Sequence, residues 1–246
     1  MRIFGLIGFP LSHSFSKKYF DEKFERLAIT DIEYRNFEID SISKLEPLMQ
    51  AHPDLCGLNV TIPYKQAVIP HLSRLSAEAE AVGAVNCIHI TPGGTTGYNT
   101  DVFGFEMSIK PFIENHYERA LILGTGGASL AVAYVLKKWG IQYFHVTRNA
   151  TASNMVNYKD LSAESLKHYP LIINTTPLGM FPDTESKPML PYEGITQNHF
   201  CYDLVYNPQE TAFMREASMR GAKVMNGLKM LELQAERSWQ IWNTEL

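Results

Sequence analysis

The stretch LILGTGGASLAVAYVL, Leu121–Leu136, decides the fold class of this 246-residue chain. Three apolar residues read as the end of a buried strand, and an alanine-rich segment of helical length follows the glycines. Glycines at such a turn let backbone N–H groups approach a pyrophosphate at the helix N-terminus, although plain strand-to-helix turns favour glycine too. The context favours a dinucleotide-binding loop formed by Gly124, Gly126, Gly127 and Ala128, with Ser129 as the third small residue.

The strand expected next, residues 143–147, indicates which dinucleotide would bind. A site for NAD usually has an acidic residue here, which binds the ribose 2′-hydroxyl. This chain has Thr147, Arg148 and Asn149. Because a guanidinium suits a 2′-phosphate, the sequence favours NADP, the alternative being a solvated arginine in a loop.

Short apolar strands alternate with amphipathic segments along the whole chain, which predicts an α/β fold with two domains. The second half has the pattern of a parallel sheet, with strands expected at 120–123, 143–147, 171–174, 201–205 and 223–225. The first half has strands expected at 3–8, 32–37 and 57–62, helices at 17–28 and 43–50, and a hairpin from 84 onward. We expect residues 1–101 to form one domain and residues 102–227 the other. A last helix, about 228–246, has an apolar stripe and is expected to pack back on the first domain.

Composition excludes several classes of protein. Hydrophobic residues make up 45% of the chain, charged residues 20%, and the net charge is −4, so neither nucleic acid nor an anionic membrane is an expected partner. No run approaches the ~20 apolar residues of a membrane span, and the N-terminal MRIFGLIGFP reads as a buried strand rather than a signal peptide. Three scattered cysteines predict free thiols and a cytoplasmic location, and the histidines lack metal-ligand spacing, so no metal site is expected.

The stretch GLNVTIPYKQAV, 57–68, has a lysine in an unusual setting. The alternation of apolar residues with Asn59 and Thr61 predicts a half-buried strand that Pro63 ends. A helix over 64–69 is expected next, with Lys65 near its N-terminus. There the helix dipole disfavours a cation by at most ~1 kcal/mol, which eases proton release.

Three further polar segments follow expected strand ends. They contain Ser12, Ser14 and Ser16, then Asn86, then Asn99, Thr100 and Asp101. Each has a plain alternative as a cap or turn residue, and Asp101 would serve as the N-cap of a helix over 102–110. Taken with Lys65 they fit one reaction, because hydride delivery to a ketone produces an alkoxide that needs an acid. Lys65 would supply that proton and Asp101 would orient the ammonium.

Eight motifs together resemble those of the shikimate dehydrogenase family. They are, in order, GFPLSHSFS, GLNVTIPYK, GAVNC, GYNTD, GTGGAS, NTTPLGM, DLVYNPQET and GLKMLELQA, and they extend from Gly8 to Ala235. The resemblance implies an NADP-dependent oxidoreductase that reduces 3-dehydroshikimate to shikimate, a step of chorismate and aromatic amino-acid biosynthesis. It also implies an N-terminal substrate-binding domain, a C-terminal Rossmann-type NADP-binding domain and an active site in the cleft between them.

The resemblance also implies roles for individual residues. Lys65 and Asp101 would be the catalytic pair. The substrate would contact Ser14, Ser16, Asn59, Thr61, Asn86, Tyr206 and Gln234. The pyrophosphate would lie on Gly124, Gly126, Gly127 and Ala128, and the 2′-phosphate on Thr147 and Arg148. The nicotinamide end would be lined by Thr175, Pro177, Leu178 and Met180, with Gly227 nearby.

The chain departs from the family pattern near its N-terminus, and two alternatives stay open. Where the family usually has proline and then a His-Asn pair, this chain has Lys17 to Phe20, and Phe9 replaces the commoner asparagine. One alternative is a related quinate/shikimate dehydrogenase that accepts quinate and NAD. The other is a non-catalytic metabolite sensor, which the presence of Lys65 and Asp101 disfavours. The resemblance leaves open a monomer or a homodimer.

Overall fold

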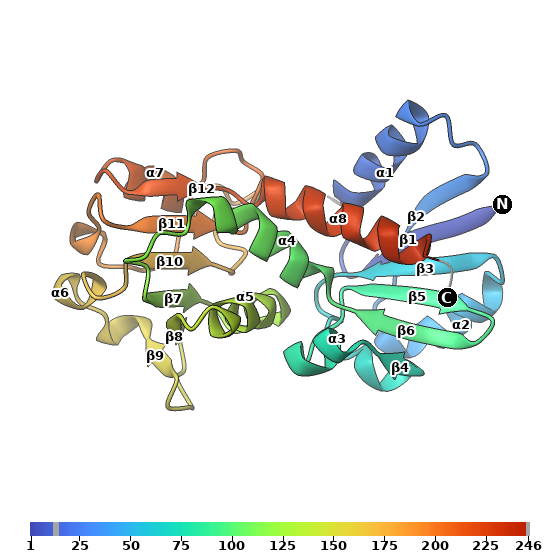
Figure 1. The fold of residues 1–246 in the computed structure, drawn as a ribbon, viewed down its shortest axis with the longest axis horizontal. Helices are drawn as coiled ribbons and strands as arrows, with labels where there is room; N and C mark the ends of the chain where they lie inside the picture. The colour runs from blue at the N-terminus through green and yellow to red at the C-terminus, as the bar shows by residue number, and fades with distance from the viewer. Residues whose placement is uncertain (12–14, 245–246) are drawn as a thin grey trace. The chain divides into compact units, whose positions relative to one another are not determined.

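The computed structural model describes residues 1–11 and 15–244 and divides the chain into two compact units. Unit 1 consists of Met1–Thr100 together with Gln234–Leu246, and unit 2 is Asp101–Leu233 (Figure 1). Each unit has its own six-stranded sheet. The predicted two-domain α/β fold is therefore confirmed.

The sheet of unit 1 has the strand order β2-β1-β3-β5-β6-β4 (Figure 1). Its first three strands in that order are mutually parallel, whereas β5 runs antiparallel to both β3 and β6, which confirms the predicted hairpin. The strands are β1 (Arg2–Gly8), β2 (Ile32–Glu38), β3 (Leu55–Val60), β4 (Arg74–Leu75), β5 (Cys87–Thr91) and β6 (Gly94–Tyr98). The α-helices of this unit are α1 (Phe15–Arg26), α2 (Leu45–Ala51), α3 (Ala77–Val82) and the larger part of α8 (Leu228–Trp242).

Both faces of this sheet are covered, which the side chains of β1 make clear. Ile3 and Ile7 pack in one cluster with α2 and α3 residues, whereas Phe4 and Leu6 pack in another with α1 and α8 residues. Such two-sided burial is typical of parallel strands. The same holds for β3, whose residues from Gly57 to Val60 are all buried. The prediction of a half-buried strand in this stretch was therefore wrong.

The predicted helix over 64–69 was also wrong. The chain forms turns at 65–68 and then a short 3-10 helix, Ile69–His71. An α-helix would need the Lys65 carbonyl to accept from the Ile69 N–H, but Val85 N donates to that carbonyl at 2.7 Å instead. A tertiary backbone bond thus replaces the helical one, and the dipole argument for Lys65 no longer applies.

The sheet of unit 2 is parallel throughout and has the order β12-β11-β10-β7-β8-β9. Counted along the chain from β7, this is the 3-2-1-4-5-6 order of the Rossmann fold read from its other edge. Its strands are β7 (Arg119–Leu123), β8 (Gln142–Thr147), β9 (Met155–Asn157), β10 (Leu171–Asn174), β11 (Phe200–Asp203) and β12 (Lys223–Met225). Its α-helices are α4 (Thr100–Ile109, from Asp101 on), α5 (Gly127–Lys138), α6 (Ala163–Leu166) and α7 (Ala212–Ser218).

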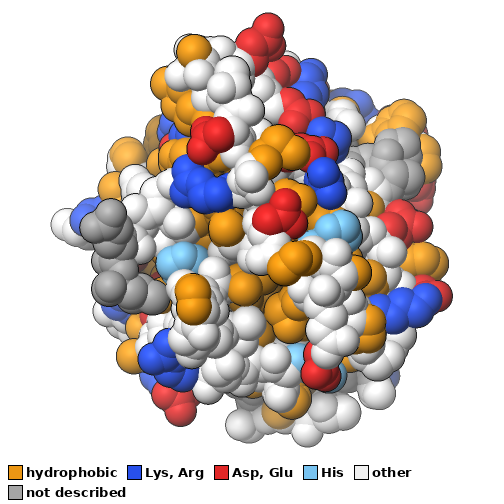
Figure 2. Space-filling view, turned by 90° about the vertical axis from the view of Figure 1, so that its right-hand side faces the viewer, with side chains coloured by type: hydrophobic (Ala, Val, Ile, Leu, Met, Phe, Trp, Pro, Cys, Tyr) orange, Lys and Arg blue, Asp and Glu red, His pale blue; other side chains and the backbone are white. Residues whose placement is uncertain are grey.

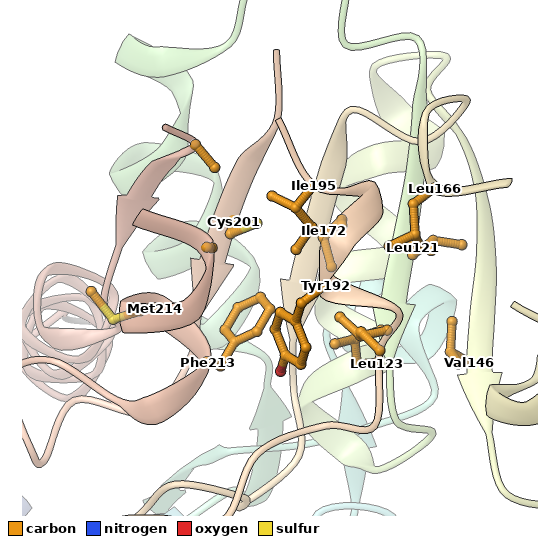
Figure 3. Packing of buried hydrophobic residues seen from close by; sticks show 13 residues of the cluster. Leu121, Leu123, Val146, Leu166, Ile172, Tyr192, Ile195, Cys201, Phe213 and Met214 are labelled. Carbon is orange, nitrogen blue, oxygen red and sulfur yellow. The ribbon is translucent and has the colours of Figure 1, made fainter. Parts of the chain in front are cut away.

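Helices cover both faces of this second sheet as well. Leu121, Ile172 and Cys201 pack on one face against α6 and α7, where the rings of Tyr192 and Phe213 lie side by side (Figure 3). On the opposite face Tyr202 contacts Phe105 and Ser108 of α4. The sequence prediction contained neither α6 nor α7, and it also lacked α3 and the short strands β4 and β9.

The surface carries charges of both signs. On the side of unit 1 that Figure 2 shows, Lys and Arg side chains lie among Asp and Glu side chains and scattered hydrophobic ones. Ion pairs also form along a helix or turn, such as Lys17 with Asp21 and Lys44 with Asp40. Over the described ranges, no helix combines the length and apolarity that crossing a membrane would require.

Candidate active site

The polar segments of unit 1 meet at one edge of its sheet. The carboxyl ends of β1, β2 and β3 lie there because these strands are parallel, and the antiparallel β5 begins there. Backbone bonds join the segments: Thr61 N donates to Ile7 O at 2.9 Å, and Val60 N donates to Asn86 O at 2.8 Å. Gly8 has no side chain at this point, where a Cβ atom would collide with Thr61.

Three predicted substrate-binding residues share one buried hydrogen-bond network. Asn86 Nδ2 donates to the Thr100 hydroxyl at 2.9 Å and lies 3.4 Å from Gln234 Oε1. Asn59 Nδ2 donates to Ser238 Oγ at 2.8 Å, and Ser238 Oγ in turn lies 3.2 Å from Thr100 Oγ1. All five side chains are at most 8% exposed. The structure therefore brings together residues from β3, the start of β5, the start of α4 and α8.

The serine motif joins the same network through a tyrosine. Ser16, in the first turn of α1, shares a hydrogen bond with the Tyr34 hydroxyl, which donates to Asn59 Oδ1 at 2.9 Å. Burial raises the pKa of Tyr34 well above its usual value, so this hydroxyl stays neutral. Ser12 and Ser14 lie outside the described residues.

The two predicted catalytic residues lie on separate elements. Lys65 is half-buried in the turn after β3, where its carbonyl binds Val85 N. Asp101 is 5% exposed and is the second residue of α4. The helix already begins at Thr100, whose N–H donates to Asn86 Oδ1 at 2.6 Å, so Asp101 is not the N-cap. The pairing of Lys65 with Asp101 stays a prediction.

In unit 2, the glycine loop follows β7 and leads directly into α5. Gly124 has φ +106°, which favours glycine, and its N–H donates to Val146 O at 2.9 Å. Gly126 is exposed at the helix N-cap, and a Cβ atom there would meet nothing within 4 Å. The loop thus leaves bare backbone and open space at the N-terminus of a 12-residue helix, which suits an anionic group.

The other predicted cofactor residues lie at the same, carboxyl, edge of this sheet. Thr147 ends β8 half-buried, and Arg148 follows it exposed. The segment after β10 starts beside the glycine loop, since Thr175 N and Thr175 Oγ1 both donate to Leu123 O, at 3.0 and 2.7 Å. Within this segment Pro177 and Met180 are exposed and Leu178 is half-buried.

Two further predicted residues follow β11 and β12. Tyr206 is half-buried, and burial raises its pKa. Gly227 is buried against Leu204, whose carbonyl leaves no room for a Cβ atom. Gly227 is therefore required for close backbone packing, a reason that its motif position alone does not reveal.

Sequence reasoning missed several residues that hold these sites. Tyr34 and Ser238 were not predicted, because a tyrosine in a strand and a serine in an amphipathic helix are ordinary in such elements. Thr100 was noted only as part of a polar segment. In unit 2 Asp203 and Asn174 form a buried pair, with Asn174 Nδ2 donating to Asp203 Oδ1 at 2.9 Å. The one available signal was their occurrence within two of the eight motifs.

Comparison with known proteins agrees with this arrangement. Residues 6–88 match the model of the shikimate dehydrogenase substrate binding domain. A shikimate dehydrogenase (NADP(+)) from Methanococcus maripaludis is 35% identical, over 98% of this chain and 91% of that relative. The crystal structure of shikimate dehydrogenase 1 from Peptoclostridium difficile matches with a TM-score of 0.87 and 39% identity, covering 100% of this chain and 93% of that one.

A second solved structure is that of shikimate 5-dehydrogenase from Thermus thermophilus in complex with NADP(H) and shikimate. It matches with a TM-score of 0.86 and 31% identity, covering 100% of this chain and 95% of that one. The likeness therefore extends over both units and includes the segments that carry the eight motifs. This chain belongs to the shikimate dehydrogenase family.

Proposed function

We propose that this protein is an NADP-dependent shikimate dehydrogenase, which reversibly reduces 3-dehydroshikimate to shikimate. The observation that carries the proposal is the match over the whole chain to an enzyme solved with NADP(H) and shikimate, at 31% identity. The buried network of unit 1 supports it independently, because amide and hydroxyl groups held in fixed orientations suit a small polyhydroxylated substrate.

Unit 1 would bind the substrate, and unit 2 would bind the cofactor. The ring hydroxyls would contact Asn59, Thr61, Asn86 and Gln234, and the carboxylate Ser14 and Ser16, with Tyr206 near the substrate. Asn59, Asn86 and Gln234 are already held by Ser238 and Thr100, so little side-chain freedom would be lost on binding.

Lys65 and Asp101 would carry out the proton transfer. The ammonium of Lys65 donates a proton to the oxygen of the substrate as the ketone becomes an alcohol, and Asp101 orients that ammonium. In the reverse direction Lys65 takes the proton back.

The residues of unit 2 fit NADP, which when bound supplies the hydride for the reduction. Gly124, Gly126, Gly127 and Ala128 would hold the pyrophosphate, because the loop presents open backbone at the start of α5. The exposed guanidinium of Arg148, beside Thr147, would pair with the 2′-phosphate. Thr175, Pro177, Leu178 and Met180 would line the nicotinamide end, near Gly227.

The biological setting follows from the reaction. Shikimate leads to chorismate and the aromatic amino acids, so the enzyme would act in that biosynthesis. Cys87 and Cys201 are buried free thiols and Cys56 is partly exposed, which fits a reducing compartment such as the cytoplasm. We expect small-molecule partners only, and either a monomer or a homodimer.

The decisive experiment is to add shikimate and NADP to the purified protein and follow NADPH by its absorbance. We expect turnover that saturates in both substrates, with NAD and quinate as separate arms. A clear preference for quinate with NAD would instead identify the related quinate/shikimate dehydrogenase. Binding of shikimate without turnover under any of these conditions would identify a sensor and would contradict the proposal.

A further inference from the structure

One carboxylate of unit 2 has no part in the proposed reaction and is nevertheless fully buried. Asp203 is the last residue of β11 and is 0% exposed. Burial raises its pKa from 3.8 to about 6, although its hydrogen bonds oppose that shift. Burial of a carboxylate costs free energy unless hydrogen bonds compensate, so the groups that bond to Asp203 indicate what this side chain does.

Three donors converge on the two carboxylate oxygens. Asn174 Nδ2 and Val205 N both donate to Oδ1, at 2.9 and 3.0 Å. Thr211 Oγ1 donates to Oδ2 at 2.6 Å. Asn174 and Thr211 are also 0% exposed, so water does not compete for these bonds. The carboxylate is therefore the common acceptor for residues at the ends of β10 and β11 and at the start of α7.

Through Asn174 the carboxylate fixes the segment that follows β10. Since the NH₂ group of Asn174 donates to Asp203, the Oδ1 atom of Asn174 faces away from Asp203 and toward the segment that follows β10. There it accepts from Thr176 N at 3.0 Å and from Thr176 Oγ1 at 2.6 Å. The Thr176 hydroxyl then lies 3.4 Å from Leu178 N. An amide can adopt two flipped orientations, and Asp203 selects the one that holds Thr176.

Through Thr211 the same carboxylate reaches the far end of that segment. Thr211 accepts from Met214 N at 3.2 Å as the N-cap of α7. Its Cβ lies 3.3 Å from where a Cβ on Gly179 would be, and Gly179 itself has φ +89°. Thr211, which Asp203 holds, thus packs beside the far end of the segment, where Gly179 N donates to Ser186 Oγ at 2.9 Å.

We propose that Asp203 is a positioning residue that sets the conformation of the Thr175–Met180 segment and thereby the affinity for NADP, but not that for shikimate. The inference rests on the proposed function, in which this segment lines the nicotinamide end of the cofactor. Asp203 itself is buried and touches neither substrate nor cofactor in this role.

The test is the variant Asp203→Asn of the full chain. It keeps the shape of the side chain but places an NH₂ group among three donors. We expect the Kd of NADP, from a fluorescence titration, and the KM of NADP to rise roughly tenfold, the effect of losing one well-placed hydrogen bond. The KM of shikimate should stay within about twofold. Turnover of shikimate by the wild type is measured alongside. Its absence would contradict the proposed function, whereas normal turnover with unchanged NADP affinity in the variant would contradict only this inference.

A matched control lies next to it on the same strand. Tyr202 is equally buried, but its side chain points to the opposite face, where its hydroxyl binds Ser108 at 2.8 Å. Tyr202→Phe should lower the melting temperature and leave both affinities unchanged. Should Asp203→Asn fail to fold, Thr176→Val decides. It removes the hydroxyl that donates to Asn174 Oδ1 at 2.6 Å and accepts from Leu178 N at 3.4 Å, and it should weaken NADP binding selectively.

Two results would overturn the inference. In the first, the folded variants bind NADP as the wild type does and only melt earlier, which makes Asp203 a purely structural residue. In the second, the affinities for NADP and shikimate fall equally, as general loosening of the protein would cause.

Discussion

At the scale of single residues, the site depends on side chains whose surroundings fix their orientation. Asn59 is an example, since Tyr34, Ser238 and the Asn86 carbonyl bind both ends of its amide. A buried amide held in this way cannot rotate without leaving a polar atom unpaired. Lys65 and Arg148 are the opposite case, because their predicted roles, proton donation and pairing with a phosphate, act on a ligand and not on the surrounding fold. Substitution of either should therefore alter function more than folding.

Lys65→Ala tests the acid role. We expect turnover of shikimate to fall by about 10²–10⁴-fold, the usual contribution of a general acid, because no other group would protonate the alkoxide as well. The Kd of shikimate, measured by calorimetry, should change little. Lys18→Ala serves as the control, since the Lys18 side chain is 76% exposed and pairs with Glu22 along α1. Near-wild-type turnover in the Lys65 variant would show that the proton comes from elsewhere.

Arg148→Gln tests the choice of cofactor. Loss of the guanidinium removes a charge-assisted contact to the 2′-phosphate, so kcat/KM for NADP should fall roughly 10–100-fold. The value for NAD, which lacks that phosphate, should stay nearly constant. The matched control is Arg119→Gln, because Arg119 is also exposed but begins β7 at the other end of the sheet. If the ratio of kcat/KM for NADP to kcat/KM for NAD does not change, Arg148 makes no contact with the 2′-phosphate and is a solvated surface residue.

At the scale of elements, the buried carboxylate at the end of β11 makes stability depend on pH. The pKa of Asp203 is raised by burial from 3.8 to about 6 in the folded protein, so between these values the folded state binds more protons than the unfolded state. Its contribution to stability is therefore present at low pH and is lost as the pH rises from about 4 to about 6, by up to about 3 kcal/mol.

Chemical unfolding of wild type and Asp203→Asn across this pH range isolates the effect. Hydrogen bonds to lysine or arginine lower the pKa values of Glu114, Glu164 and Glu216, so the stability contribution of these residues rises with pH. Wild type and variant share this contribution, and it cancels in their difference. The difference in unfolding free energy, wild type minus variant, should fall as the pH rises. A difference that is flat or that rises would mean that Asp203 is ionised throughout.

Elements with a strong local pattern were predictable from the sequence, and those defined by tertiary contacts were not. The strands Leu171–Asn174 and Lys223–Met225 have the predicted bounds, and the last helix begins at the predicted Leu228, because hydrophobic periodicity indicates these elements. The helix expected over 64–69 does not form, because Val85 N donates to the Lys65 carbonyl that a helical hydrogen bond would need. Motif order predicted Asn59, Asn86 and Gln234, which the structure joins in one network, but no local signal distinguishes Tyr34 or Ser238 from ordinary core residues.

At the scale of the whole molecule, the chain starts and ends in the same unit. Unit 2 is one continuous segment, whereas unit 1 needs the last turns of α8 to complete its core. Ala235 and Trp242 belong to the aromatic cluster with Phe4 and Phe20, and Trp242 Nε1 donates to Ile88 O at 2.9 Å. The stability of unit 1 therefore depends on residues more than a hundred positions away in the sequence.

Ending the chain after Leu233 should unfold unit 1 and leave unit 2 folded. Loss of a buried tryptophan such as Trp242 alone costs about 3–5 kcal/mol, a large part of the stability of a typical domain. Hydrogen exchange should then show β1 and β3 losing protection while β7 and β10 keep theirs. Ending the chain after Trp242 is the control, because it removes only exposed described residues, Asn243 and Thr244, and should change neither pattern. If β1 stays protected in the chain that ends after Leu233, unit 1 folds without most of α8, and the aromatic cluster does not need Trp242 for its stability.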